Sequence, residues 1–271
     1  MKKTKFAVFF AALISMLSFT SCLDSDGGSS TNSMYTVLRV NGFTGGYWFT
    51  DAAGCQYVPN NQSVLANSGL EQYQYAFVGF TYDASQVTQD TKKIGVDLYA
   101  ASPVKTFYAD EVQGDEMNEY SNAAFQAVAT DITYKTYVTF FTRNDIFVPV
   151  SYYYKASSNN DELKAELNSH DFRLFFDKEQ SSSSTMKLSI RHHVQDPTAN
   201  KDRTTVGSEY LHFNLASVLA SYQNMFNTTP MTIEIEYLYN YSSSGLGDNP
   251  IPKQIEVDYK AWSDEFDKIN Q

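Results

Sequence analysis

The sequence contains little cysteine and no apolar run long enough to cross a membrane. Cys22 and Cys55 are the only two cysteines among the 271 residues. The longest apolar segment, residues 6–17, has about 12 residues, whereas a membrane-spanning helix needs roughly 20. A transmembrane helix in the mature protein is therefore not expected.

Positive charge is also scarce. The chain has 20 lysines and arginines against 31 aspartates and glutamates, and a formal net charge of −11 at pH 7. Without residues 1–21 the net charge would be −14, because that segment holds three lysines and no acidic residue. This balance argues against nucleic acid or anionic lipid as a partner of the folded part.

The amino terminus has the layout of a secretory signal. Lys2, Lys3 and Lys5 precede the apolar run, and small and polar residues follow it as far as Cys22. The stretch FTSC, which ends at Cys22, resembles a bacterial lipobox, although Phe19 stands where leucine is usual. We predict a lipoprotein signal peptide over residues 1–21 and lipidation of Cys22, which would anchor the protein in a membrane through its acyl chains.

The residues after Cys22 predict a flexible tether and a signal for the cellular location of the protein. Residues 22–33 are rich in serine, glycine and aspartate, the composition of a flexible linker. The acidic pair Asp24 and Asp26 resembles the surface-export signal of lipoproteins in Bacteroides-like bacteria. We therefore expect the protein at the cell outer membrane, exposed at the surface. With Cys22 acylated, Cys55 would have no disulfide partner, and we expect it to be a small buried side chain.

Alternating apolar and polar residues dominate the rest of the chain. A period of two is the pattern of β-strands. We predict strands at 35–41, 47–50, 55–58, 73–82, 94–99, 125–129, 133–142, 148–154, 171–176, 186–194, 209–213, 231–239 and 255–259. Gly79 is a candidate bulge, and short helices are expected at 160–167, capped by Asn160, and at 215–222.

This pattern predicts an all-β fold of two domains. We expect an OB-like small β-barrel over residues 34–108, a looser acidic linker over 109–122, and a β-sandwich domain over 123–271 with one or two short helices.

Four stretches carry a resemblance to a known family: SCLDSDGG at 21–28, YAFVGFTYDASQV at 75–87, KKIGVDLYAASPV at 92–104 and IEVDYKAW at 255–262. Together with the layout, they resemble the NigD-like family of bacterial outer-membrane lipoproteins. The resemblance implies a lipidated terminus, an N-terminal OB-type barrel and a C-terminal β-sandwich. The family has no assigned enzymatic role, and its association with bacteriocin gene clusters implies an accessory or immunity-like role. No functional residues carry over from it.

The histidines are the first candidates for chemistry. His192 and His193 are adjacent in a predicted strand, so their side chains should point to opposite faces. A zinc site would need His170, His212 or acids from elsewhere. We expect one inward and one exposed histidine, and we predict no metal and no cofactor.

Exposed aromatic residues are the second candidates. The chain has 20 tyrosines and 19 phenylalanines but only 2 tryptophans. Alternation places Tyr152 and Tyr154 on one face of a strand and Tyr153 on the other. Tyr152, Tyr154 and Trp48 are candidate stacking residues for a sugar or peptide; the alternative is that the tyrosines cap the core.

The sequence favours a binding or accessory role over catalysis. It lacks the GxSxG elbow of serine hydrolases, and the acidic pairs at 115–116 and 264–265 lie in polar flanking stretches. We predict a protein that is not an enzyme and whose partners are the membrane, through Cys22, and an envelope protein or glycan. One alternative is a carbohydrate-binding surface lipoprotein of a glycan-uptake system. The other is an envelope hydrolase whose carboxylates are not identified.

Overall fold

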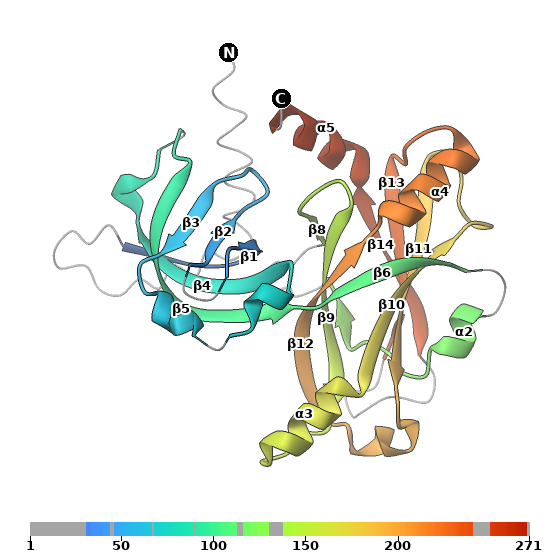
Figure 1. The fold of residues 1–271 in the computed structure, drawn as a ribbon. Coiled ribbons are helices and arrows are strands. Elements are labelled where there is room, and N and C mark those ends of the chain that lie inside the picture. Colours follow the sequence, from blue (N-terminus) through green and yellow to red (C-terminus); the bar gives the residue numbers. More distant parts are fainter. Residues whose placement is uncertain are drawn as a thin grey trace. The chain divides into compact units, whose positions relative to one another are not determined.

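The computed structural model describes residues 31–43, 46–66, 68–88, 90–112, 116–129, 138–240 and 250–269. The chain divides into two compact units, and the boundary between them lies between Lys105 and Thr106. Both units consist mainly of strands (Figure 1). The all-β fold with two domains is thus confirmed. Within the described residues, no helix is long and apolar enough to span a membrane.

The first unit is a closed five-stranded barrel with the strand order β1-β2-β3-β5-β4. This is the Greek-key barrel of an OB-fold. Its strands are β1 (Thr31–Asn41), β2 (Trp48–Thr50), β3 (Gln56–Pro59), β4 (Tyr75–Asp83) and β5 (Lys93–Val104). The short 3₁₀ helices of this unit are η1 (Gln62–Leu65), η2 (Leu70–Gln72) and η3 (Ala84–Gln86).

The barrel forms because one side of each strand is apolar. In β5, Ile94, Val96 and Leu98 are buried while the residues between them are exposed. They pack with side chains of the other strands into one core. The register between β4 and β5 shifts between Gly79 and Phe80, which confirms the predicted bulge at Gly79. β1 begins at Thr31, so the last residues of the expected tether belong to the barrel.

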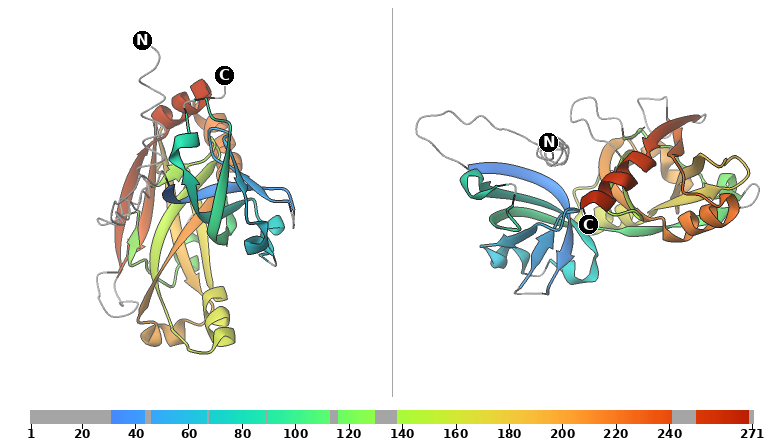
Figure 2. Two further views of the ribbon diagram at one scale, coloured as in Figure 1. Left: turned by 90° about the vertical axis from the view of Figure 1, so that its left-hand side faces the viewer. Right: turned by 90° about the horizontal axis from the view of Figure 1, so that it is seen from above.

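The second unit is one nine-stranded sheet within the described residues. Its strands are β6 (Thr106–Val112), β7 (Ala127–Val128), β8 (Thr139–Phe140), β9 (Asp145–Tyr154), β10 (His170–Asp177), β11 (Thr185–Val194), β12 (Thr205–Asn214), β13 (Thr232–Tyr239) and β14 (Ile251–Asp258). The view from above in Figure 2 shows the sheet curling. The curl brings the segment before β7 to the far side of the sheet, where Phe125 pairs with Tyr239. The sheet therefore encloses a single core instead of packing two separate sheets.

Four α-helices are described, and Figure 1 places α3 and α4 at opposite ends of the curled sheet. They are α2 (Glu116–Tyr120), α3 (Asn160–Asn168), α4 (Ala216–Phe226) and α5 (Tyr259–Ile269), and η4 (Pro197–Asp202) is a 3₁₀ helix. The predicted helices at 160–167 and 215–222 correspond to α3 and α4. The cap of α3 is Asn159 and not Asn160, because the Asn159 side chain accepts a hydrogen bond from the Asp161 backbone N–H at 2.9 Å.

The boundary between the units lies earlier than the sequence analysis placed it. The expected linker at 109–122 overlaps β6, which pairs in parallel with β10 and β12 inside the curled sheet. It also overlaps α2. Asp110 and Glu111, two of the acidic residues that suggested a loose segment, are exposed residues of β6 and follow the buried Ala109. The prediction of a linker was wrong for these described residues.

Candidate functional site

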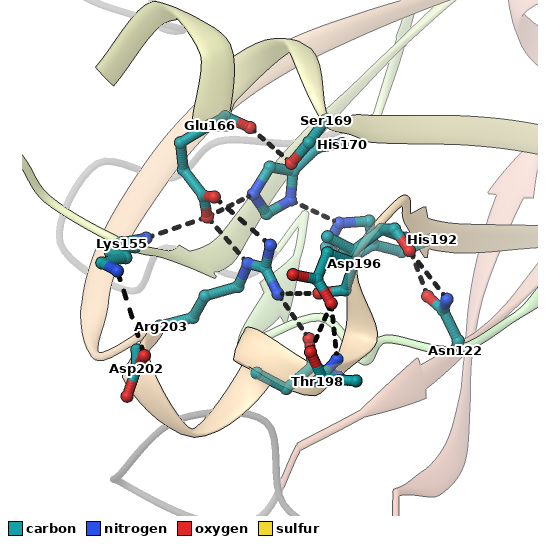
Figure 3. A network of polar contacts seen from close by, with 12 residues as sticks. Asn122, Lys155, Glu166, Ser169, His170, His192, Asp196, Thr198, Asp202 and Arg203 are labelled. Atoms are coloured by element: carbon teal, nitrogen blue, oxygen red, sulfur yellow. Dashed lines mark hydrogen bonds and ion pairs between the residues drawn. The ribbon is translucent and has the colours of Figure 1, made fainter. Parts of the chain in front are cut away.

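A buried polar network joins α3, β10, β11 and the end of η4 (Figure 3). Its centre is a pair of histidines: His170 Nδ1 lies 2.8 Å from His192 Nε2, so one of the two nitrogens donates to the other. His170 Nε2 lies 3.2 Å from Glu166 Oε1. We call Glu166, His170, His192 and Arg203 the histidine network.

Arg203 anchors this network. Its Nε and Nη2 donate to the two carboxylate oxygens of Glu166 at 2.7 and 3.2 Å, the bidentate geometry that holds a carboxylate most firmly. Its Nη1 donates to the Asp196 carbonyl and to Asn200 Oδ1, both at 2.7 Å. The Lys155 backbone N–H also donates to Glu166, at 3.0 Å. The contacts to Glu166 tie the end of η4 and the residue after β9 to α3, and the contacts of Nη1 hold the η4 segment together.

The network lies inside the protein. Arg203 is 1% exposed and His192 is 0% exposed. The rings of Phe172 and Tyr152 lie against the two histidines, with centroid distances of 4.8 Å for Phe172–His192 and Tyr152–His170. Burial, and then the neighbouring His170, hold the pKa of His192 well below its usual range. Burial alone would raise the pKa of Glu166, but Arg203, the Lys155 N–H and His170 outweigh it and lower that pKa.

The adjacent histidines do point to opposite faces of β11, but neither is exposed. His192 enters the core, while His193 is half-buried and its Nδ1 lies 2.8 Å from the Tyr120 carbonyl oxygen. The expectation of one exposed histidine was therefore wrong, because α2 covers that face. Among the described residues, no group of three or more His, Cys, Asp or Glu side chains could hold a metal ion.

His212 forms a second buried cluster at the start of β6. Its Nε2 lies 2.9 Å from Asp145 Oδ1, and its Nδ1 lies 3.0 Å from Thr106 Oγ1. A hydrolase triad also joins a hydroxyl, an imidazole and a carboxylate, but there the hydroxyl bonds to Nε2 and the carboxylate to Nδ1, the reverse of the contacts of His212. His212 is moreover 0% exposed, and Asp145 also accepts hydrogen bonds from Thr142 and Asn214. We assign this cluster the structural role of fixing the first residue of β6 to β12 and β9.

The tyrosines of β9 are not a surface platform. Tyr152 is 4% exposed, its ring lies in the core, and its hydroxyl donates to Glu209 at 3.1 Å. Tyr153 is 3% exposed, and Tyr154 is half-buried against the same core. Stacking of a ligand on Tyr152 is ruled out by this burial, and the alternative that the tyrosines cap the core is the one observed.

Trp48, the third stacking candidate, is on the surface. It is the first residue of β2 and is 38% exposed. Gly42, with φ of +84°, makes room for it, since a Cβ atom there would lie 2.9 Å from the indole ring. Its neighbour Tyr47 is buried.

Sequence reasoning missed an aromatic cluster on the outer side of the barrel. Tyr35 of β1, Phe77 of β4 and Tyr99 of β5 lie together, with ring centroids 5.8 Å apart for Tyr35–Phe77 and 5.0 Å apart for Tyr35–Tyr99. Tyr99 is 44% exposed. We call these three residues the barrel aromatic face. The signal for it was Gly79, a residue without a side chain in the middle of an aromatic strand.

Gly79 lies directly beneath the rings of Tyr35 and Tyr99 in the barrel aromatic face. A Cβ atom at this position would lie 2.5 Å from Tyr35 Cε1 and 2.7 Å from Tyr99 Cε2, closer than such atoms approach. The change Gly79→Ala is therefore expected to lower the free energy of unfolding of the barrel by about 1–3 kcal/mol, measured by denaturant unfolding. Gly46→Ala is the control, because nothing lies within 4 Å of a Cβ there. Equal effects of the two changes would contradict this packing.

Polar side chains lie beside the aromatic rings. Asp97 and Tyr99 are two residues apart on β5 and both are exposed, so they share its outer face. The Asn60 Nδ2 donates to Asp97 Oδ1 at 3.2 Å, and the Asn60 amide lies over Gly95, whose added Cβ would meet Asn60 Oδ1 at 3.3 Å. A hydrogen-bonded amide and carboxylate thus lie along the face of β5 that carries Tyr99.

The remaining candidates do not converge on a site. Cys55 is 5% exposed, as expected for a small buried side chain, and burial together with Asp51 raises its pKa to about 11, so the thiol stays protonated. Asp264 and Glu265 pair with Lys260 and Lys268 on the exposed surface of α5. Asp115 and Cys22 lie outside the described residues.

No family model matches the sequence, and no curated protein matches it significantly. Solved structures do resemble it. A Bacteroides fragilis NCTC 9343 protein described as a lipoprotein aligns with a TM-score of 0.71 and 26% identity, over 84% of this chain and 98% of that one. A Bacteroides vulgatus ATCC 8482 protein of unknown function aligns with a TM-score of 0.49 and 11% identity, over 84% and 91% of the two chains.

A NigD-like immunity protein from Bacteroides caccae ATCC 43185 aligns with a TM-score of 0.48 and 12% identity, over 86% of this chain and 99% of that one. The Bacteroides fragilis protein has this fold over almost its whole length. The description of the Bacteroides caccae protein names the NigD-like family, which the four quoted stretches of this sequence resemble.

Proposed function

We propose that this protein is a lipid-anchored protein of the cell envelope, displayed at the outer membrane, with a non-catalytic binding or accessory role. The stretch FTSC at residues 19–22 carries the proposal, because it follows a basic and apolar leader and precedes a flexible acidic tether. The Bacteroides fragilis relative described as a lipoprotein supports it, since it matches 84% of this chain.

The burial of the histidines supports binding over catalysis. A general acid or base must come within hydrogen-bond reach of its substrate. His192 and His212 are 0% exposed. Both ring nitrogens of His212, and Nε2 of His192, are occupied by contacts that join neighbouring strands. The carboxylates of α5 that a hydrolase could use are paired with lysines instead.

The proposal is tested by metabolic labelling with a palmitate analogue in a Bacteroides host that carries the full-length gene. We expect the wild-type protein to take up the label and to fractionate with the outer membrane. The change Cys22→Ser should abolish the label, because the thiol that accepts the diacylglycerol is lost.

Cys55→Ala is the matched control, since it removes the other cysteine and should leave labelling unchanged. Protease treatment of intact cells tests surface display, and the wild-type protein should be cleaved. A label that persists in the Cys22→Ser variant, or a wild-type protein that takes up none, would contradict the anchor.

A further inference from the structure

We propose that the outer side of the barrel over β1, β4 and β5 binds a neutral glycan. The barrel aromatic face would stack against the apolar side of a sugar ring, and Asp97 with Asn60 would bind its hydroxyl groups. The inference gives the binding role proposed above a ligand class and a site. It rests on that binding role and not on the lipid anchor.

The aromatic rings are fixed before any ligand arrives. Tyr35 lies between Phe77, stacked at an interplanar angle of 17°, and Tyr99, at 82° to it. The Tyr99 hydroxyl donates to the Met34 carbonyl at 3.3 Å. Partial burial, followed by Tyr35, raises the pKa of Tyr99 to about 12, so the hydroxyl is neutral. A ring that is already held in place loses little conformational entropy on binding.

Gly79 allows the aromatic rings to pack close to the backbone of β4. With no side chain on the central strand at this position, the rings of Tyr35 and Tyr99 approach its backbone from the strands on either side, at 82° to each other. Tyr99 keeps 44% of its surface exposed. The C–H groups on one side of a pyranose ring form a flat apolar surface of the kind that packs on an exposed aromatic ring.

The polar side chains next to Tyr99 suit hydroxyl groups. A carboxylate accepts hydrogen bonds and an amide both accepts and donates, and each sugar hydroxyl can do both. Asp97 and Asn60 are exposed and are already joined by a hydrogen bond of 3.2 Å, which fixes their orientation. Asp97 lies on the same outer face of β5 as Tyr99.

The charge on this face favours a neutral ligand. Among the exposed residues of β5 from Lys93 to Tyr99, Asp97 is the acidic residue next to Tyr99 and Lys93 is a basic residue at the far end, and the whole chain has a net charge of −11. An acidic polysaccharide or a single-stranded nucleic acid would be repelled, even though both are ligands of OB-type barrels elsewhere. A neutral polyhydroxylated chain meets no such repulsion.

The test is isothermal titration calorimetry of the full-length protein, purified in detergent, with five linear neutral hexasaccharides: those of the malto, cello, xylo, laminari and manno series. Polygalacturonate serves as the acidic probe. We expect at least one hexasaccharide to bind and polygalacturonate not to bind. Tyr99→Ala should weaken that binding at least about tenfold, which corresponds to about 1.4 kcal/mol, and Asp97→Asn should weaken it severalfold.

Tyr108→Ala is the control, since it removes an aromatic residue that is 70% exposed on β6 of the second unit, and it should leave the affinity unchanged. Trp48→Ala tests the other exposed aromatic candidate of the barrel. Circular dichroism checks that each variant is folded. The proposal is overturned if no hexasaccharide binds the wild-type protein, if only polygalacturonate binds, or if the loss follows Trp48→Ala and not Tyr99→Ala. Palmitate labelling is independent of all these outcomes, so a failure here leaves the lipid anchor standing.

Discussion

Replacing Arg203 with alanine is expected to lower the free energy of unfolding of the second unit by about 3–5 kcal/mol, because the change leaves a buried charge without its partner. Arg203 is 1% exposed and supplies two hydrogen bonds to Glu166, whose side chain is 14% exposed. Its other bonds hold the Asp196 carbonyl and Asn200. All four contacts would be lost together, and the space vacated lies inside the protein.

Urea unfolding followed by circular dichroism measures this effect at pH 7. Lys155→Ala is the matched control, since the Lys155 ammonium lies 3.9 Å from Asp202 and its side chain is 57% exposed. An exposed ion pair contributes about 0–1 kcal/mol, so the control should unfold almost as the wild type does. An Arg203→Ala variant as stable as Lys155→Ala would show that the histidine network does not hold the unit together.

The second large effect is a loss of stability in acid through His192. Burial keeps the pKa of this histidine well below its ordinary value, so the folded protein holds it neutral while the unfolded chain binds a proton. His170, His193, Arg203 and the Ala124 backbone act on its pKa, and the rings of Phe125, Tyr152 and Phe172 pack against it; no carboxylate is among these groups. Below an unfolded pKa of about 6.5, stability should fall by about 1.4 kcal/mol for each pH unit.

Comparison with His192→Gln isolates this contribution, since glutamine keeps polar atoms near His170 and cannot titrate. The variant should be less stable than the wild type at pH 7, and the difference should shrink as the pH falls from 7 to 5. Glu166 does not interfere in this range. Its folded pKa is lowered, so the stability it contributes is present above its ordinary value and is lost only at lower pH. Parallel pH profiles of the two proteins would contradict a neutral buried His192.

The barrel could be predicted from the sequence because its strands have one buried and one solvated face. Between Lys93 and Tyr99 every second residue is buried, so the apolar period of two is visible in the letters alone. The curled sheet shows why the same reasoning failed for Tyr152. Both faces of β9 are covered, and eight of its ten residues are buried. The alternation of the sequence assigns residues to the two faces of a strand, but it does not show whether either face is exposed to solvent.

The histidine network could be predicted only in part. Glu166 and His170 are four residues apart, but Arg203 comes from the end of a 3₁₀ helix that no sequence period reveals. The helix α5 could have been predicted from the sequence but was not. Tyr259, Trp262 and Phe266 recur at helical spacing, and two of their rings pack on Phe140. The barrel aromatic face depends on the pairing of β1, β4 and β5, which sequence separation conceals.

Mass spectrometry of the amino-terminal peptide, from protein purified from the membranes of its native host, tests the central claim of a lipid-anchored envelope protein most directly. The expected result is a mature chain that begins at Cys22 and carries the mass of a diacylglycerol and a further acyl chain. A peptide that retains residues 1–21, or one with an unmodified thiol at Cys22, would contradict it.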